Sequence, residues 1–262
     1  MVDGGVCIIA EPGSTANGDL DTMRRQVWEA RACGANVFKA QWTSNPARMV
    51  QRRNAIPYLR AYGRLAFPRA WLDVLADECR AADLAFACSV YLPEDVAADL
   101  PVRFVKLASF EALDFEMLRA CEAAGVATVI STGMTNSADL ATLLWWRDEH
   151  PATKLLHCVS AYPALTADLN LAVIRSYALD GFSDHTCSLL TGALAVAYGA
   201  DYVETHFRLD DCASDNPDFQ VSLTLHQFSH YCQNIRVAER ARGEGRKRLI
   251  GAEGAMLGYR VR

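Results

Sequence analysis

Short runs of apolar and β-branched residues recur along the chain, and each run ends in polar residues before an amphipathic segment begins. Continuous apolar runs of this length are typical of parallel strands that are buried on both faces. The pattern predicts eight strands, at residues 6–11, 36–41, 84–91, 103–109, 127–134, 154–160, 181–185 and 202–207.

The segments between these runs have helical periodicity, and several of them end at a glycine. We expect helices at residues 20–33, 69–82, 115–124, 138–149, 171–178, 188–199 and 225–240, with a short one at 93–100. Strands that alternate with helices favour an α/β fold with a parallel sheet. Eight such units in 262 residues, with no linker or change of composition, favour a single-domain (β/α)8 TIM barrel spanning residues 1–262 over a doubly wound sheet.

Composition narrows the environment in which the chain works. The formal net charge is -5 and hydrophobic residues make up 51% of the chain, which is ordinary for a globular protein and disfavours nucleic acid or an anionic membrane as partner. No apolar run is long enough to span a membrane, and the first residues do not resemble a signal peptide, so we expect a cytoplasmic protein. The nine cysteines have no CxxC spacing and are expected to be reduced thiols.

Polar residues stand where each predicted strand ends. The carboxyl ends of all strands in a barrel form one rim, and barrel enzymes place their active sites there. The rim is expected to carry Glu11, Lys39, Gln41, Ser89, Lys106, Ser109, Glu111, Ser131, Thr132, His157, Ser160, Tyr162, Ser183, His185, Glu204 and His206.

Two pairs of these residues suggest chemistry. His185 and His206 end neighbouring strands, so their imidazoles form a half-shell for a divalent metal; two structural histidines bonded to carbonyl groups are the alternative. Lys39 and Lys106 lie inside apolar strands and need an anionic partner, which is either a bound polyanion or a structural ion pair with Glu11, Glu111 or Glu204. A Cys158–His157 nucleophile pair is disfavoured because neighbours on a strand point to opposite faces.

Several ordered motifs resemble the sialic acid synthase family, from about residue 6 to residue 222. They are IIAEPGSTANGD at 8–19, VFKAQ at 37–41, KLAS at 106–109, ISTGM at 130–134, LLHC at 155–158, YP at 162–163, FSDHT at 182–186 and VETHF at 203–207. The resemblance implies a metal-dependent transferase of carbohydrate biosynthesis. It would condense phosphoenolpyruvate with a small sugar aldehyde and give a 2-keto-3-deoxy sugar acid and phosphate.

The resemblance also assigns roles to individual residues. His185 and His206 match the ligands of a metal, usually Mn²⁺, with Mg²⁺ and Co²⁺ as alternatives. Glu11 matches a glutamate between the acceptor and the attacking water, and with Lys106 and the two histidines it makes up the expected catalytic set. The other expected substrate-binding residues are Lys39, Gln41, Ser109, Ser131, Thr132, Ser160, Tyr162, Ser183, Glu204 and Asp218. Four of them match positions that line the metal or acceptor side: Gln41, Tyr162, Glu204 and Asp218.

The chain departs from the family pattern near the acceptor side. Ala16 stands where a histidine is usual, and the loop at 43–57 looks short. Val90 stands where a threonine is usual, which would replace a hydroxyl on the phosphoenolpyruvate side with a methyl group. Phe110 stands where a glycine is usual, which would narrow the site. We expect no C-terminal antifreeze-like domain after the barrel. We therefore expect an acceptor other than ordinary N-acetylmannosamine, and leave open a homodimer or a second chain that completes the site.

Two other classes of function are compatible with these residues. A strand lysine, Lys106 or Lys39, would form a Schiff base in a class I aldolase. A non-catalytic barrel that binds a sugar or phosphate would need neither metal nor turnover. The joint presence of Glu11, both lysines and both histidines favours the synthase.

Overall fold

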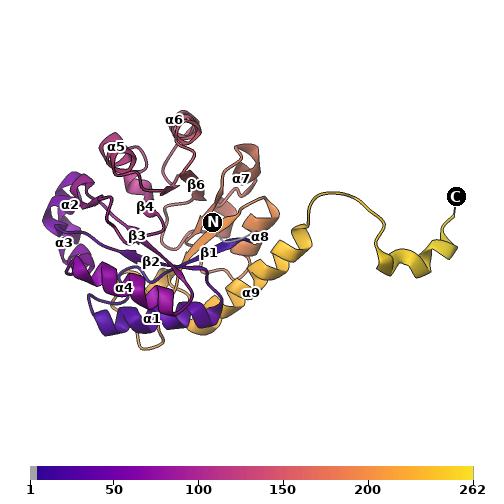
Figure 1. The fold of residues 1–262 in the computed structure, drawn as a ribbon, viewed down its shortest axis with the longest axis horizontal. Coiled ribbons are helices and arrows are strands. Elements are labelled where there is room, and N and C mark those ends of the chain that lie inside the picture. Colours follow the sequence, from indigo (N-terminus) through magenta and orange to yellow (C-terminus); the bar gives the residue numbers. More distant parts are fainter. Residues whose placement is uncertain (1–4, 262) are drawn as a thin grey trace.

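The computed structural model describes residues 5–261, in which eight parallel strands close into one barrel in chain order (Figure 1). The predicted (β/α)8 barrel is therefore confirmed. The strands are β1 (Cys7–Glu11), β2 (Val37–Gln41), β3 (Ala85–Ser89), β4 (Val105–Leu107), β5 (Thr128–Ser131), β6 (Thr153–Cys158), β7 (Gly181–Asp184) and β8 (Tyr202–His206).

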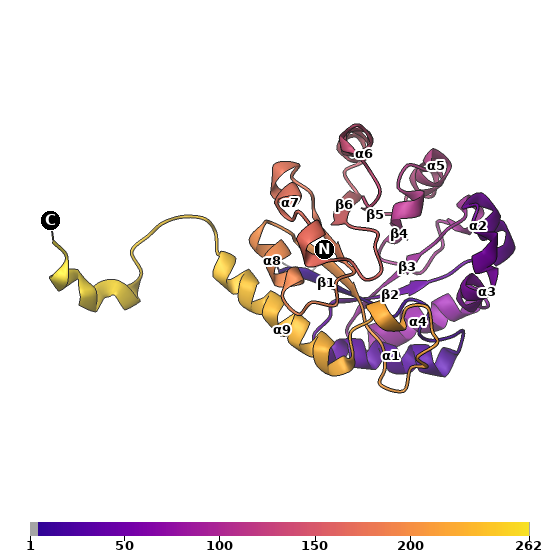
Figure 2. The same cartoon turned by 180° about the vertical axis from the view of Figure 1, so that it is seen from behind.

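Helices surround the barrel and cover the outer faces of the strands (Figures 1 and 2). They are α1 (Leu20–Cys33), α2 (Pro46–Arg52), α3 (Leu59–Tyr62), α4 (Ala70–Ala81), α5 (Phe115–Ala124), α6 (Ser137–Glu149), α7 (Ala172–Ser176), α8 (Thr191–Ala197) and α9 (Leu225–Arg242). No helix in this part of the chain is both long enough and apolar enough to cross a membrane.

Strand alternation divides the interior into two apolar layers. On β1, Ile8 and Ala10 face outward and belong to the large core between strands and helices. Cys7 and Ile9 face the barrel axis and belong to a smaller inner core with Val37, on β2. Successive side chains of a strand point to opposite faces, so Glu11, two residues after Ile9, also faces the axis. The register thus aims the last residue of the strand at the carboxyl-end mouth.

Helix ends follow the local sequence. Asp19 caps α1 by accepting a hydrogen bond from the Thr22 backbone, and Gly34 ends the helix with φ of 101°. Only glycine adopts that left-handed conformation without strain. This stop turns the chain directly into β2, which carries Lys39 and Gln41 to the mouth.

The region at 43–57, expected as a loop that is short for the family, contains the helix α2. Asn45 accepts a hydrogen bond from the Arg48 backbone, and Pro46 fills the first helical position. A proline there costs nothing, since the first turn leaves its backbone donors unpaired. Several predicted strands also end earlier than expected, β3 at Ser89 and β6 at Cys158, because their last polar residues have already entered the loops.

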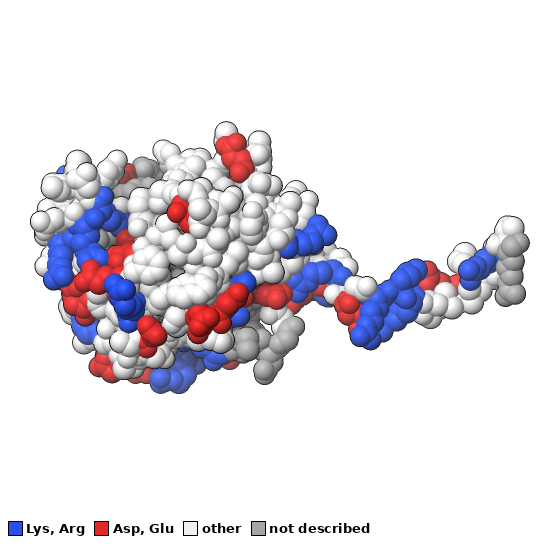
Figure 3. All heavy atoms as spheres, turned by 90° about the horizontal axis from the view of Figure 1, so that it is seen from above, with Lys and Arg blue, Asp and Glu red and all other residues white. Residues whose placement is uncertain are grey.

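The chain beyond α9 projects away from the barrel (Figures 1 and 2). Up to residue 261, where the described structure ends, its only regular element is a 3-10 helix at Gly251–Tyr259. Its exposed apolar side chains include Leu249, Met256 and Tyr259. Lysine and arginine side chains gather on this projecting segment (Figure 3). We call residues 243–261 the C-terminal arm.

Candidate active site

The carboxyl ends of the strands enclose a small polar cavity of about 50 Å³, which we call the mouth pocket. Seven strands contribute to its lining directly, and the loop after β6 contributes Tyr162, as expected for the carboxyl end of a barrel. The lining residues are Glu11, Lys39, Gln41, Ser89, Lys106, Ala108, Ser109, Ser131, Tyr162, Ser183, His185, Glu204 and His206.

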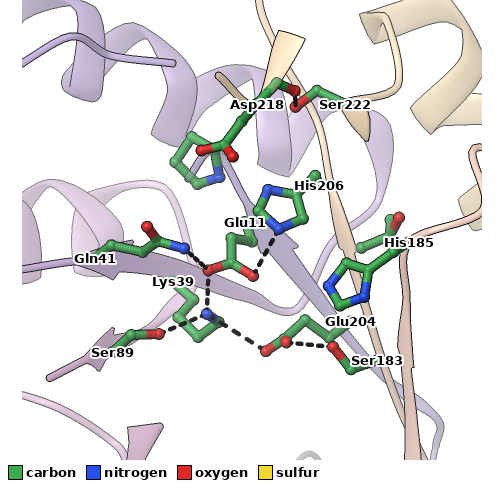
Figure 4. A network of polar contacts seen from close by, with 12 residues as sticks. Glu11, Lys39, Gln41, Ser89, Ser183, His185, Glu204, His206, Asp218 and Ser222 are labelled. Carbon is green, nitrogen blue, oxygen red and sulfur yellow. Dashed lines mark hydrogen bonds and ion pairs between the residues drawn. The ribbon is translucent and has the colours of Figure 1, made fainter. Parts of the chain in front are cut away.

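Glu11 lies at the centre of this pocket (Figure 4). One carboxylate oxygen accepts hydrogen bonds from Lys39 Nζ and, at 2.6 Å, from Gln41 Nε2. The other lies 3.5 Å from His206 Nε2. Burial alone would raise the pKa of Glu11, but the charges of Lys39 and His206 hold it well below its ordinary value. Glu11 is therefore a carboxylate that links the lysine side of the pocket to the histidine side.

Glu204 lies between the two buried lysines. Its Oε2 is 3.6 Å from Lys39 Nζ, and its Oε1 is 3.6 Å from Lys106 Nζ. Ser183 donates a hydrogen bond of 2.8 Å to Oε1, while Oε2 has no hydrogen-bond partner. The resemblance placed Glu204 on the metal or acceptor side, whereas the structure places it beside both ammonium groups.

Each lysine also donates a hydrogen bond to a serine hydroxyl. Lys39 Nζ lies 2.8 Å from Ser89 Oγ, and Lys106 Nζ lies 2.7 Å from Ser131 Oγ. Burial alone would lower the pKa of Lys39, but Glu11 and Glu204 raise it above its ordinary value. The structural ion pairs considered above for Lys39 are present. Glu111 takes no part in them, because it forms a bidentate pair with Arg53.

His185 and His206 approach each other on the other side of Glu11, with ring centroids 5.6 Å apart. His185 Nδ1 donates a hydrogen bond of 3.2 Å to the Val159 carbonyl, which can only accept one. Burial alone would lower the pKa of His185, but its contacts with Cys158 and the Val159 carbonyl raise it to about 9. His206 Nδ1 is buried without a hydrogen-bond partner. A cation bound by these two rings would therefore have to displace a proton from His185, because a metal binds only an unprotonated nitrogen.

No three His, Cys, Asp or Glu side chains within residues 5–261 converge closely enough to bind a metal on their own. The protein groups that fit a divalent cation are therefore two imidazoles, which supply half of a shell. Tyr162 covers the pair from outside, with its ring centroid 4.5 Å from that of His185.

Cys158 connects the histidine side to Ser109, in the segment that follows β4. Its Sγ lies 3.7 Å from His185 Nδ1 and 3.5 Å from Ser109 Oγ. Ser109 in turn accepts a hydrogen bond of 3.1 Å from the Gly133 backbone. His157 points to the opposite face and bonds to the Leu169 carbonyl, so the expected separation of Cys158 and His157 is confirmed.

Ser160 lies next to this group but does not line the mouth pocket. A Cβ at Gly133 would lie 2.1 Å from Ser160 Oγ and 2.6 Å from Ser109 Oγ. Only glycine leaves room for both hydroxyl groups, which explains the residue at this position.

Two further predicted residues lie outside the mouth pocket. Thr132 donates a hydrogen bond to the Leu156 carbonyl and lines a separate cavity beside α6. Asp218 accepts hydrogen bonds of 2.7 Å from both the backbone and the hydroxyl of Ser14. A Cβ at Gly13 would lie 2.5 Å from Asp218 Oδ2 and 2.9 Å from His206 Nδ1, so Asp218 lies close to the histidine side.

The departures from the family pattern lie outside the pocket lining. Ala16 and Val90 are buried in the outer core between strands and helices. Phe110 is half exposed and packs over the Arg53 guanidinium, 4.6 Å from its ring centroid. The expectations that Val90 removes a hydroxyl from the pocket and that Phe110 narrows it were wrong, because neither side chain reaches it.

Two residues that were not predicted as part of the site contact the predicted site residues. They are Ser89, which the sequence indicated only as the end of a strand, and Cys158.

A family model described as the NeuB family matches residues 19–247. The chain belongs to this family. It is 29% identical to N,N'-diacetyllegionaminic acid synthase of Legionella pneumophila over 92% of the chain and 74% of the relative. It is also 29% identical to human N-acetylneuraminate-9-phosphate synthase, over 94% of the chain and 74% of that relative.

A solved structure with the same barrel is the N-acetylneuraminic acid synthetase of Leptospira borgpetersenii, in complex with citrate. The two folds agree with a TM-score of 0.87 at 23% identity, over 98% of this NeuB-family chain and 91% of the other. At this sequence identity, the similarity shows that the two proteins share a fold.

Proposed function

We propose that the chain joins phosphoenolpyruvate to an open-chain sugar aldehyde, giving a 2-keto-3-deoxy sugar acid and inorganic phosphate. The observation that carries the proposal is the pairing of two buried lysines with two facing imidazoles across Glu11, at the mouth of the barrel. Membership of the NeuB family and the printed names of the relatives support the same chemistry.

Charge explains why the proposal includes a divalent cation. Lys39 and Lys106 are balanced by Glu11 and Glu204, so these four side chains carry no net charge. Phosphoenolpyruvate would add a phosphate and a carboxylate to this buried site, and uncompensated buried charge is costly. A cation held by His185 and His206 would supply the missing positive charge; Mn²⁺ is the ion we propose, with Mg²⁺ and Co²⁺ as alternatives.

The pocket also has to change shape. A volume of about 50 Å³ is too small for a three-carbon phosphate ester while both carboxylates keep their lysine contacts. Glu204 is held less closely than Glu11. It accepts one hydrogen bond, from Ser183, and lies 3.6 Å from each ammonium group. Glu11, in contrast, accepts hydrogen bonds from Lys39 and Gln41. We infer that the phosphate or carboxylate of the donor takes the place of Glu204 between the two ammonium groups.

The residues then divide the reaction between them. Lys39, Lys106 and the hydroxyls of Ser89, Ser131 and Ser183 would hold the donor with its third carbon toward the acceptor aldehyde. A bound cation would polarise the aldehyde oxygen. After the carbon–carbon bond forms, water adds to the second carbon of the donor, with Glu11 as the general base, and phosphate leaves.

Glu11 is well placed for this role. It is ionised, because neighbouring positive charge lowers its pKa, and Gln41 and His206 orient its two oxygens from opposite sides. A low pKa makes it a weak base in the resting site. Displacement of Lys39 toward the donor would raise that pKa and strengthen it.

The same contacts weigh against the aldolase alternative. A Schiff base needs a neutral amine, and the carboxylates around Lys39 raise its pKa, which keeps it protonated. Borohydride trapping with a keto acid would distinguish the two mechanisms. A covalent adduct on Lys39 or Lys106 would support the aldolase and contradict the synthase.

The test of the proposal is phosphate release from phosphoenolpyruvate, measured across a panel of aldoses and amino sugars. The protein is first treated with a chelator and then supplied with Mn²⁺, Mg²⁺ or Co²⁺. Release that needs both an aldehyde and a metal supports the synthase, and a clear preference for N-acetylmannosamine would contradict our proposal of a different acceptor. Absence of release with every aldehyde and metal would favour a non-catalytic barrel.

A further inference from the structure

The opposite end of the barrel contains a second cavity, of about 630 Å³, which we call the amino-end cavity. It lies where the strands begin, since its lining includes the first residues of β1, β2, β3 and β8 (Cys7, Val37, Ala85 and Tyr202). Nothing in the mouth pocket is shared with it. The volume falls within the range of about 300–1,000 Å³ that small-molecule sites occupy.

Small side chains create this space. Barrel interiors are usually filled by layers of bulky branched residues. Here the floor consists of Cys7, Val37, Ala85, Phe104, Ala127 and Val129, of which three carry one heavy atom or two beyond the backbone. Burial raises the pKa of Cys7 to about 12, so its thiol stays neutral and the floor is apolar.

The rim of the cavity is cationic. It carries Arg31, Arg103 and Lys154 against one acidic residue, Asp83. Arg31 is paired with Asp83 at 3.0 Å and Lys154 with Asp180 at 3.0 Å. Within residues 5–261 no carboxylate lies within ion-pair distance of Arg103, so its charge is the one that a bound anion would meet.

We propose that the amino-end cavity binds a small molecule with an apolar body and a carboxylate or other anionic head. The body would fill the floor around Phe104, and the head would face Arg103 and Lys154 at the rim. This site would be separate from the phosphoenolpyruvate chemistry, which takes place at the other end of the same strands.

The C-terminal arm of a second copy is the main rival occupant. Its apolar side chains are exposed, and it leaves α9 at the amino end of the barrel, because Arg242 at the end of α9 bonds to Ala200 and Asp201 just before β8. The arm has four basic residues and two acidic ones, Glu244 and Glu253, so its net charge has the same sign as the rim. Like charges at close range are unfavourable, so charge favours the small anion.

The experiment uses the full chain and 8-anilino-1-naphthalenesulfonate, whose apolar rings and sulfonate match the proposed class. We expect one saturable site, from which 4-phenylbutyrate displaces the probe and its uncharged amide does not. Phosphoenolpyruvate should leave the probe bound. Displacement by phosphoenolpyruvate, or equal displacement by acid and amide, would overturn the proposal.

Two variants locate the site. Arg103→Gln removes the exposed cation without touching the floor, and we expect probe binding to weaken about tenfold. Ala127→Leu fills the floor and should abolish binding. The matched control is Arg119→Gln, an exposed arginine on α5 that should bind the probe as the unaltered chain does.

Melting temperatures of the variants, within a few degrees of the parent, establish that they fold. Unchanged binding in both variants would show that the probe sits elsewhere. A synthetic peptide of residues 246–261 is the last competitor: displacement by it, together with a dimer in solution, would assign the cavity to the arm and overturn the small-anion proposal.

Discussion

The two ends of the barrel are built from the same strands and differ in almost every physical property. The mouth pocket is polar, charged and nearly filled, at about 50 Å³, whereas the amino-end cavity is apolar, rimmed with cations and hollow, at about 630 Å³. On β1 the change takes place over five residues, from Cys7 to Glu11, both of which face the axis. The same strands therefore line both cavities, which share no residue.

The largest expected difference between the two ends of the barrel comes from removing an imidazole in the mouth pocket. His185→Ala or His206→Ala should lower phosphate release more than about a thousandfold, because the metal and its charge compensation would be lost together. Steady-state turnover with saturating Mn²⁺ measures it. The control is His157→Gln, because His157 faces the helices and bonds to the Leu169 carbonyl. Near-normal turnover in His185→Ala would refute the mechanism.

The next effect concerns Glu11, which joins the two halves of the mouth. Glu11→Gln keeps the shape and removes the base, so we expect kcat to fall about 10²–10³-fold with little change in probe binding at the amino end. A fall confined to KM, with kcat unchanged, would mean that Glu11 only positions substrate.

A smaller effect is expected from crowding the loop after β5. Gly133→Ala places a Cβ 2.1 Å from Ser160 Oγ, and Ser109 must also shift. Displaced hydroxyls should raise KM for phosphoenolpyruvate about tenfold. Gly63→Ala is the matched control, since nothing lies within 4 Å of its added Cβ. Equal kinetics in the two variants would show that Ser109, which lines the mouth pocket, does not contact the donor.

The smallest effect is on stability and pH. The folded chain holds the pKa of Glu11 below its ordinary value of 4.5, so its ionisation stabilises the fold above pH 4.5, and this contribution is lost as pH falls further. Urea unfolding between pH 6 and pH 3 should show that Glu11→Gln loses ~1 kcal/mol less than the parent over this range. Parallel curves would argue against the ion pair.

The sequence predicted the barrel and most of its mouth because both depend on local rules. Alternation aims Glu11, Lys39 and Glu204 inward, and parallel strands bring their ends together. What it could not predict depends on neighbours distant in the chain. The sequence left Glu11, Glu111 and Glu204 open as partners of the buried lysines. It could not show that Glu111 is taken by Arg53, which lies 58 residues away in the chain.

The side-chain direction expected from the sequence was also wrong for single residues near strand ends. Val90 and Phe110 follow strand ends, where the chain is already turning into a loop and alternation no longer fixes the face. Thr132 likewise leaves the β5 ladder and bonds to the β6 backbone. The sequence did not indicate the amino-end cavity. Small apolar residues in a strand have the same pattern whether larger side chains from neighbouring strands fill the barrel interior beside them or leave it empty.

The last helix holds the first strand in place. Arg236 of α9 donates a 2.6 Å hydrogen bond to the Val6 carbonyl, Glu239 accepts one from the Val6 backbone, and β8 pairs with β1 along its whole length. A nascent chain emerging from a ribosome cannot make these contacts until nearly all of it has been synthesised. Until then β1 remains an open sheet edge that is free to pair with other chains. Premature release of this protein should therefore yield aggregates rather than a partial barrel.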